Sequence, residues 1–281
     1  MVGKACHILN VTTNLRRLFI IGIILSFLSC NLSGKKPESQ KDKEMFGLFK
    51  KKTGKKTEVI SHADYNLIFE NKEVENTPIE LLKIGDLNVP SGEIVVCDPL
   101  VYSDTPPLTK KVKPGKYPVK IYVAKTKDSG DRYAIAKLEF SNKKAEKWIM
   151  ALRAEDDINE LIDEADYFGF PVDAGLGGFY DFRSGQEYQK FESDFMKTNP
   201  EGNIYDDFFA AEFKKNAKDQ NDPKDIGDWI NFQLPNSELN ITMFHSGYGD
   251  GTYPSYWGID KEGEIVSLVI DFLVLLVPKY E

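Results

Sequence analysis

The sequence has few of the residues that usually carry covalent catalysis or structural metal binding. Its 281 residues include three cysteines and three histidines. Cys6, Cys30 and Cys97 are too few and too scattered for a disulfide framework or a cysteine-based zinc site. Cys97 is the one cysteine beyond the N-terminal region. Because free cysteine is among the most buried residue types, we expect it to be a core residue rather than a nucleophile.

Sequence motifs of several enzyme classes are also absent. There is no Gly-x-Ser-x-Gly elbow, and only His62 and His245 lie outside the N-terminal region, so the partners of a nucleophilic triad are missing. Gly175, Gly177 and Gly178 do not have the spacing of a dinucleotide-binding fingerprint, and no Lys-Ser/Thr pair follows them as in a phosphate-binding loop. We expect these glycines to form a tight bend next to a strand.

Basic residues are scarce outside the N-terminal region. Residues 1–60 hold 12 of the 36 lysines and arginines but 4 of the 44 aspartates and glutamates, which leaves residues 61–281 with a net charge of −16. An acidic surface repels the phosphate backbone, so we expect no binding of nucleic acid. An acidic surface suits a protein partner with a basic surface, or no partner at all.

The N-terminal region has the composition of a secretory signal. The basic pair Arg16-Arg17 precedes residues 18–28, which are almost wholly apolar. This run is too short to span a membrane as a helix, and the order of a basic region, a short apolar run and a small residue is typical of a signal that is removed. We therefore expect residues 1–29 to be a signal peptide.

The end of this signal resembles the lipobox of bacterial lipoproteins, in which a small residue precedes a cysteine that is acylated. Ser29 and Cys30 fit that pattern, whereas Phe27 stands where leucine is usual. We expect acylated Cys30 to insert in a lipid bilayer and to anchor the protein to a bacterial membrane of the cell envelope. Simple secretion and an uncleaved anchor are the alternatives. Residues 30–57 are polar and rich in lysine, and we expect a flexible tether.

Short apolar runs separated by turn residues predict the fold class of the remaining chain. No repeat or linker divides residues 58–281, so we expect one globular domain. The runs predict a strand-dominated α+β fold with antiparallel, β-sandwich-like sheets. Ser184 and Glu187 have the spacing of a capping box and begin a predicted two-helix insertion around residues 184–217.

Turn signals between the apolar runs predict which strands pair. Residues 82–89 and 93–98 flank a Pro-Ser-Gly turn and are expected to form a hairpin. Residues 118–124 and 133–140 are expected to form another. The stretch 241–277 has two turn signals and predicts a three-stranded meander, whose last strand is apolar on both faces and therefore central.

Several carboxylates and their neighbours form the candidate site. Asp271 lies in an apolar strand, where a buried carboxylate must be hydrogen-bonded or matched by a cation. It either pins a loop through hydrogen bonds, or it converges with Asp250 and with Asp173 or Asp98 on a cation or polar ligand. The full set of candidate residues is Asp98, Asp173, Gly175, Gly177, Asp181, His245, Ser246, Asp250, Gly251, Trp257 and Asp271.

Four segments rich in glycine and proline resemble a known family. They are residues 90–99 (PSGEIVVCDP), 114–119 (PGKYPV), 172–181 (VDAGLGGFYD) and 246–260 (SGYGDGTYPSYWGID). In this order they resemble the DUF4241 family of mainly bacterial proteins, over about residues 80–277. Gly178 stands where a cysteine is common in the family. The function of the family is unknown, so the resemblance implies a single domain and supplies no established catalytic residue.

Three functions fit these observations. The first is a membrane-anchored lipoprotein whose domain binds a protein or a small polar ligand, without catalysis and without a cofactor. The second is a hydrolase, with or without a divalent cation, in which at least three carboxylates lie within about 5 Å in an open cleft. Its candidate carboxylates are Asp98, Asp173, Asp250 and Asp271. The third is an immunity-type protein that neutralises a basic toxin with its acidic surface.

Overall fold

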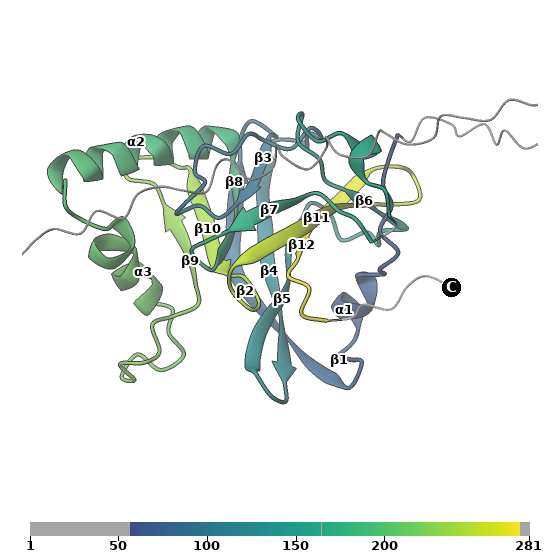
Figure 1. Ribbon diagram of the computed structural model, residues 1–281, viewed down its shortest axis with the longest axis horizontal. Helices are drawn as coiled ribbons and strands as arrows, with labels where there is room; N and C mark the ends of the chain where they lie inside the picture. The colour runs from purple at the N-terminus through teal and green to yellow at the C-terminus, as the bar shows by residue number, and fades with distance from the viewer. Residues whose placement is uncertain (1–56, 164, 276–281) are drawn as a thin grey trace, which may run out of the picture. The chain divides into compact units, whose positions relative to one another are not determined.

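The computed structural model describes residues 57–163 and 165–275 of the chain (Figure 1). Strands dominate this part and form two antiparallel sheets, and helical segments cover their outer faces. The predicted strand-dominated α+β class with sandwich-like sheets is confirmed. The predicted signal peptide, Cys30 and nearly all of the predicted tether lie outside the described residues. Within residues 57–163 and 165–275, no helix is long and apolar enough to cross a membrane.

The larger sheet has the strand order β1-β2-β4-β5-β12-β11-β6, and β7 pairs with the first half of β11. Its strands are β1 (Glu73–Val74), β2 (Thr77–Val89), β4 (Gly115–Thr126), β5 (Gly130–Glu139), β6 (Lys147–Met150), β7 (Gly169–Val172), β11 (Gly251–Ile259) and β12 (Ile265–Asp271). The predicted hairpin of residues 118–124 and 133–140 is confirmed as β4 and β5. The last predicted strand is confirmed as central, because β12 lies between β5 and β11.

The smaller sheet has the strand order β3-β8-β10-β9. Its strands are β3 (Ile94–Cys97), β8 (Leu176–Asp181), β9 (Trp229–Gln233) and β10 (Asn240–His245). Alternation along β10 places Phe244 in the core between the sheets and Ile241 and Met243 on the opposite face. Both faces of this sheet are therefore covered.

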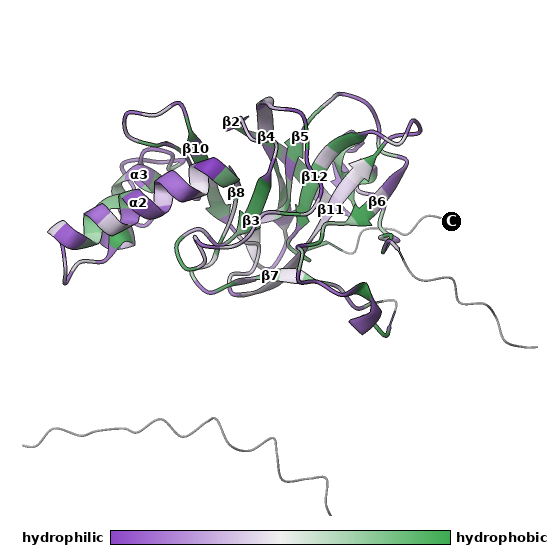
Figure 2. Ribbon diagram, turned by 90° about the horizontal axis from the view of Figure 1, so that it is seen from above, coloured by the Kyte–Doolittle hydropathy of each residue, from purple (hydrophilic) through white to green (hydrophobic). Residues whose placement is uncertain are grey.

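Apolar side chains between the two sheets form the main core. Val119, Leu138 and Leu268 from the larger sheet share this cluster with Phe179 and Phe244 from the smaller one. In Figure 2, β3, β5 and β6 are hydrophobic, whereas α2 is mostly hydrophilic. This pattern is that of a sandwich, in which the inner faces of two stacked sheets exclude water together.

Helical segments cover the outer faces of the sheets. They are α1 (Asn66–Glu70), α2 (Phe182–Thr198), a π-helical turn η2 (Tyr205–Phe209) and α3 (Ala210–Lys214). A short 3-10 helix η1 (Ile158–Glu160) lies in the connection between β6 and β7, and none of its residues is buried. Ile68 of α1 packs on the larger sheet. Tyr188, Phe209 and Phe213 of α2, η2 and α3 pack on the smaller sheet. The predicted two-helix insertion is confirmed, but α2 begins at Phe182 because Asp181, and not Ser184, caps it.

Two of the predicted strand pairings are wrong. The segments 82–89 and 93–98 belong to different sheets, as β2 and β3. The predicted meander of residues 241–277 is also divided, because β10 lies in the smaller sheet and β11 and β12 in the larger one. A turn rich in glycine and proline reverses the chain equally well within one sheet and between two stacked sheets. Local sequence therefore predicted the turns, but it did not predict whether the two strands that flank a turn pair with each other.

A bend in β2 joins the two sheets. Its pairing with β4 is interrupted between Lys83 and Asp86, and Gly85 there has a φ of +98°. The side-chain amide of Asn231 donates to the carbonyls on either side of Gly85, at 3.1 Å to each. Asn240 donates to the Asp86 carbonyl at 2.8 Å. These amides satisfy backbone groups that the interrupted ladder leaves without partners.

Replacement of Gly85 by alanine tests this junction. A Cβ there would lie 2.7 Å from Nδ2 of Asn231, and the positive φ adds backbone strain. We expect Gly85→Ala to lower the free energy of unfolding by roughly 2 to 4 kcal/mol. Gly130→Ala is the matched control, since φ is +71° and no atom lies within 4 Å of its Cβ. It should cost roughly 1 kcal/mol. Urea denaturation measures both variants. If Gly85→Ala and Gly130→Ala lowered the free energy of unfolding equally, a role for the asparagine amides would be contradicted.

Candidate functional site

The bend between β7 and β8 is attached to the end of β3. Asp98 follows β3, is fully buried, and accepts hydrogen bonds from the backbone nitrogens of Ala174 (2.6 Å) and Asp173 (3.2 Å). Burial raises the pKa of Asp98, and these backbone donors oppose the increase. The carboxylate of Asp173 accepts a hydrogen bond from the hydroxyl of Tyr102. Asp98 therefore fixes the conformation of the bend.

The glycines of this segment allow close packing. Gly175 has a φ of +68° at the tip of the predicted bend. Gly177 and Gly178 lie within β8, where a Cβ would come 2.9 Å from the ring of Phe272 and 2.5 Å from Pro99, respectively. A cysteine at position 178 would require a shift of its neighbours. The glycines therefore serve packing and do not form a phosphate-binding loop.

The loop between β10 and β11 lies beside this bend. The backbone nitrogen of Ser246 donates to the carbonyl of Gly175 at 3.0 Å, and its hydroxyl donates to the carbonyl of Gly249 at 2.8 Å. Asp250 and Gly251 are exposed. Gly251 pairs with Val172 at the end of β7, so Asp250 and the bend lie at the same end of this ladder. The structure thus brings the segments of Asp98, Asp173 and Asp250 together.

Asp271 points away from these segments. It is 6% exposed and accepts hydrogen bonds from the hydroxyl of Tyr65 and the backbone nitrogen of Leu273, both at 2.8 Å. Tyr65 belongs to the outer apolar layer beneath α1, whereas the next residue, Phe272, packs in the core between the sheets. Burial raises the pKa of Asp271 to about 6, although both hydrogen bonds lower it. The structure therefore shows the loop-pinning arrangement.

Asp181 and Trp257 have structural positions. One carboxylate oxygen of Asp181 accepts from the backbone nitrogen of Arg183 and caps α2, and the other accepts from the backbone nitrogen and hydroxyl of Ser91. Trp257 is fully buried in the core between the sheets. Neither side chain faces an open cleft.

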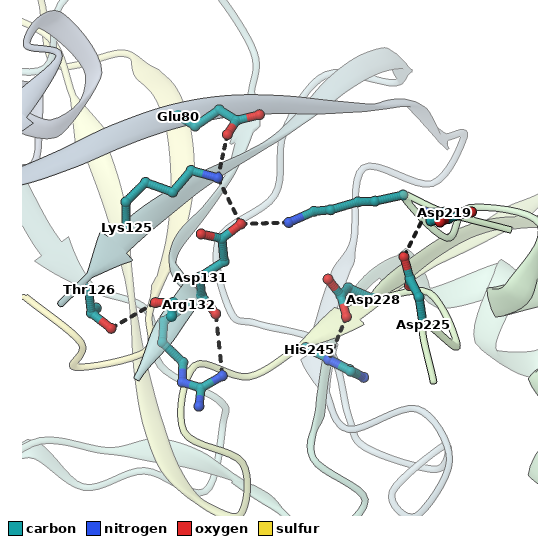
Figure 3. Close-up of polar contacts among 11 residues, drawn as sticks. Glu80, Lys125, Thr126, Asp131, Arg132, Asp219, Asp225, Asp228 and His245 are labelled. Carbon is teal, nitrogen blue, oxygen red and sulfur yellow. Dashed lines mark hydrogen bonds and ion pairs between the residues drawn. The ribbon is translucent and has the colours of Figure 1, made fainter. Parts of the chain in front are cut away.

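His245 lies in a surface pair at the end of β10 (Figure 3). Its Nδ1 is 3.3 Å from Oδ1 of Asp228, and its ring stacks on Phe213. The imidazole lowers the pKa of Asp228. The two side chains are 41% and 36% exposed, so water screens the pair. It fixes the end of the loop between α3 and β9 against β10.

A second polar network holds the same loop from the other side (Figure 3). Lys218 of this loop pairs with Asp131 at 2.6 Å, and Asp131 also pairs with Lys125 at 2.7 Å. Lys125 in turn pairs with Glu80 of β2 at 2.5 Å. These contacts connect the loop to the β4–β5 hairpin, and both lysines lower the pKa of Asp131.

The arrangement required for the hydrolase is not observed in the described part of the chain. Asp98 is fully buried, Asp271 faces another layer, and only Asp173 and Asp250 are exposed. Among residues 57–163 and 165–275, no group of three or more His, Cys, Asp and Glu side chains is placed to hold a metal ion. The predicted site residues therefore do not form a single site.

A pocket that sequence reasoning missed opens at one end of the larger sheet, where β4 and β12 begin and β5 ends. We call it the sheet-end pocket. Its volume is about 700 Å³, within the range of small-molecule sites. Its lining consists of Lys111, Val112, Lys113, Pro114, Tyr117, Phe140, Ser141, Lys143, Asp260, Glu264, Ile265 and Val266.

Two aromatic rings form an apolar surface within the pocket. Tyr117 and Phe140 meet edge to face, with ring centroids 5.0 Å apart. Phe140 also lies 6.2 Å from the ring of the core residue Trp257, so this surface continues the core between the sheets. The hydroxyl of Tyr117 donates to the carbonyl of Lys113 at 2.6 Å. We call these two rings the aromatic floor, and their packing makes it preformed.

Most charges around the pocket are paired. Lys111 pairs with Glu93 at 2.7 Å. Lys143 pairs with Asp260 at 2.7 Å and with Glu262 at 3.2 Å. The ammonium group of Lys143, together with backbone donors, lowers the pKa of Asp260 to about 2, so this carboxylate stays ionised. These pairs fix the walls of the pocket.

One sequence signal marks this pocket. Residues 110–120 contain five lysines and no acidic residue, in a region of the chain whose net charge is strongly negative. The segment includes residues 114–119, which the sequence already relates to the family pattern. The other lining residues, such as Phe140 and Glu264, lie outside it and converge only in the folded chain.

Comparisons with known proteins give one match. A model of the family described as "Protein of unknown function (DUF4241)" matches residues 87–270. This range contains all the residues that line the sheet-end pocket. Neither the curated proteins nor the solved structures yield a match.

The buried carboxyl group of Asp271 should make stability depend on pH. Its pKa is raised from 3.8 to about 6 in the folded state, so its contribution is fully present below pH 4 and is lost as pH rises through 6. Asp271→Asn does not titrate. Relative to this variant, the wild type should lose up to about 3 kcal/mol of unfolding free energy between pH 4 and pH 7. Denaturant unfolding at both pH values measures the difference.

A second variant serves as a control. Tyr65→Phe removes one donor to the carboxylate and should enlarge the pH dependence. A difference between wild type and Asp271→Asn that stays constant from pH 4 to pH 7 would contradict the burial of an ionisable group at this position.

Proposed function

The chain belongs to the DUF4241 family, whose function is unknown, and we propose that it is a membrane-anchored lipoprotein that binds a small ligand in the sheet-end pocket without catalysis. The observation that carries the binding role is the pocket itself. It combines about 700 Å³ of space, a preformed aromatic floor and a rim of lysines and carboxylates. An apolar surface with a few oriented polar groups is the usual composition of a ligand site.

The positions of the carboxylates support a role without catalysis. A general acid or base must reach the substrate. Asp98, Asp181 and Asp271 are instead buried, and each accepts hydrogen bonds from backbone nitrogens. A buried carboxylate that holds backbone donors stabilises a fold, and its release would leave those donors without partners.

The membrane anchor is supported by the sequence. The basic pair, the apolar run and the Ser29-Cys30 step have the order of a lipoprotein signal, and the polar residues that follow suit a tether. Such a protein would present its binding pocket near the surface of a bacterial membrane. A single acyl chain gives weak attachment, so stable anchoring would need a second acyl chain or the basic residues of the tether.

Blocking the pocket tests the binding role. We expect saturation-transfer NMR against a mixture of amino acids, carboxylic acids, sugars and nucleotides to show binding to the wild-type chain. Ser141→Tyr places a ring in the pocket and should abolish these signals. Ser129→Tyr, at the exposed β4–β5 turn, is the matched control and should leave them unchanged. Hits that survive Ser141→Tyr, or no hits at all, would overturn the binding role. Conversion of a hit would instead support an enzyme.

Lipid attachment has a separate test. Cells that express the full chain and are fed labelled palmitate should incorporate the label into the protein. Cys30→Ser removes the thiol that receives the lipid and should abolish incorporation. Cys6→Ser, at the other cysteine of the N-terminal region, is the control and should leave it unchanged. Equal labelling of wild type and Cys30→Ser would refute the lipoprotein assignment.

A further inference from the structure

Two unpaired charges of opposite sign line the sheet-end pocket. Lys113 lies in the loop before β4, and Glu264 directly precedes β12. Within residues 57–163 and 165–275, neither side chain has an ion-pair partner, whereas Lys111, Lys143 and Asp260 of the same lining are all paired. The pocket therefore offers one free cation and one free carboxylate, both exposed to solvent.

The sheet sets the spacing of the two strands that these residues precede. β4 and β12 are the two neighbours of β5, so they lie two strand spacings apart, or about 10 Å. Phe140 follows β5 and lies between them, and its backbone nitrogen donates to the carbonyl of Val266 at 2.9 Å. Phe140 of the aromatic floor thus lies between the two strands, and Lys113, Glu264 and both rings line the same pocket.

The requirements of such a site are specific. A simple anion would pair with Lys113 but would be repelled by Glu264. A simple cation would pair with Glu264 but would be repelled by Lys113. A molecule that carries both charges and an apolar group satisfies all three features. Electrostatic complementarity of this kind contributes chiefly to specificity, because exposed ion pairs are individually weak.

We propose that the sheet-end pocket binds a small zwitterion of the amino-acid type, with its carboxylate on Lys113, its ammonium group on Glu264 and an apolar side chain on the aromatic floor. This inference rests on the proposed binding function and names its ligand class. The pairs that involve Lys111 and Lys143 would hold the walls while the ligand neutralises the two remaining charges.

Calorimetry with three related probes tests the ligand class. The probes are L-phenylalanine, its amide, which lacks the carboxylate, and N-acetyl-L-phenylalanine, which lacks the ammonium group. Loss of either charge should weaken binding by about fivefold, the factor that corresponds to one exposed ion pair. Equal affinities for the three probes would overturn the zwitterion assignment.

Single substitutions test the role of each charge. Lys113→Gln should weaken binding of L-phenylalanine by about fivefold and leave binding of the amide unchanged. Glu264→Gln should weaken L-phenylalanine equally and leave the N-acetyl compound unchanged. Lys116→Gln and Glu201→Gln replace exposed residues outside the lining and are the matched controls. Effects of the control variants equal to those of the lining variants would contradict direct contacts.

The two proposals fail in distinguishable ways. If none of the three probes binds while the NMR mixture still yields hits that Ser141→Tyr removes, the zwitterion inference is wrong and the binding function stands. If the mixture yields no such hits, the binding function itself is wrong. If Lys113→Gln weakened binding of the amide and left binding of the N-acetyl compound unchanged, the proposed contacts of the two charges would be refuted.

Discussion

The amide hydrogen bonds of Asn231 and Asn240 to the bent strand β2 hold the two sheets in one structure. β2 pairs with β4 on both sides of an interruption, and it also contacts β8, β9 and β10 of the smaller sheet. Contact with both sheets requires the bend at Gly85, where the ladder is interrupted. The amides satisfy the carbonyls that this interruption frees, at a position where the backbone adopts a φ that favours glycine. The shared core between the sheets depends on this junction.

Buried carboxylates extend the same principle through the fold. The chain crosses between sheets at several turns, and each crossing leaves backbone nitrogens outside a regular ladder. Asp98 accepts hydrogen bonds from such nitrogens at the β7–β8 bend, and Asp181 and Asp271 accept them from nitrogens outside a ladder at the start of α2 and the end of β12. Some of the many acidic residues of this chain thus stabilise the fold by accepting hydrogen bonds from backbone nitrogens. Burial costs these groups solvation, and the hydrogen bonds offset that cost.

The sheet-end pocket follows from the sandwich architecture. The loop that precedes β4 lies against the turn before β3, since the backbone nitrogen of Val112 donates to the carbonyl of Gly92 at 2.9 Å. The pocket opens where β4 and β12 begin and β5 ends. Core aromatics therefore continue into a solvent-accessible opening. Lysines and carboxylates from separate turns surround this apolar surface, and among residues 57–163 and 165–275 the ion pairs leave Lys113 and Glu264 without a partner. Apolar packing fixes the shape of the pocket, and the zwitterion that we propose as its ligand would pair with the two remaining charges.

The sequence by itself determined the strand-dominated class, the β4–β5 hairpin, the central β12 strand, the helices that cover the smaller sheet and the burial of Cys97, because each depends on periodicity or residue type over a short stretch. Only the tertiary structure decided which turns change sheets, that Asp181 caps α2, and that Asp271 faces Tyr65 rather than Asp173. It also assembled Lys113, Phe140 and Glu264 into one pocket. The physical reason is that a turn signal specifies reversal of the chain, while the choice of partner depends on burial of both sheet faces, which involves residues far apart in sequence.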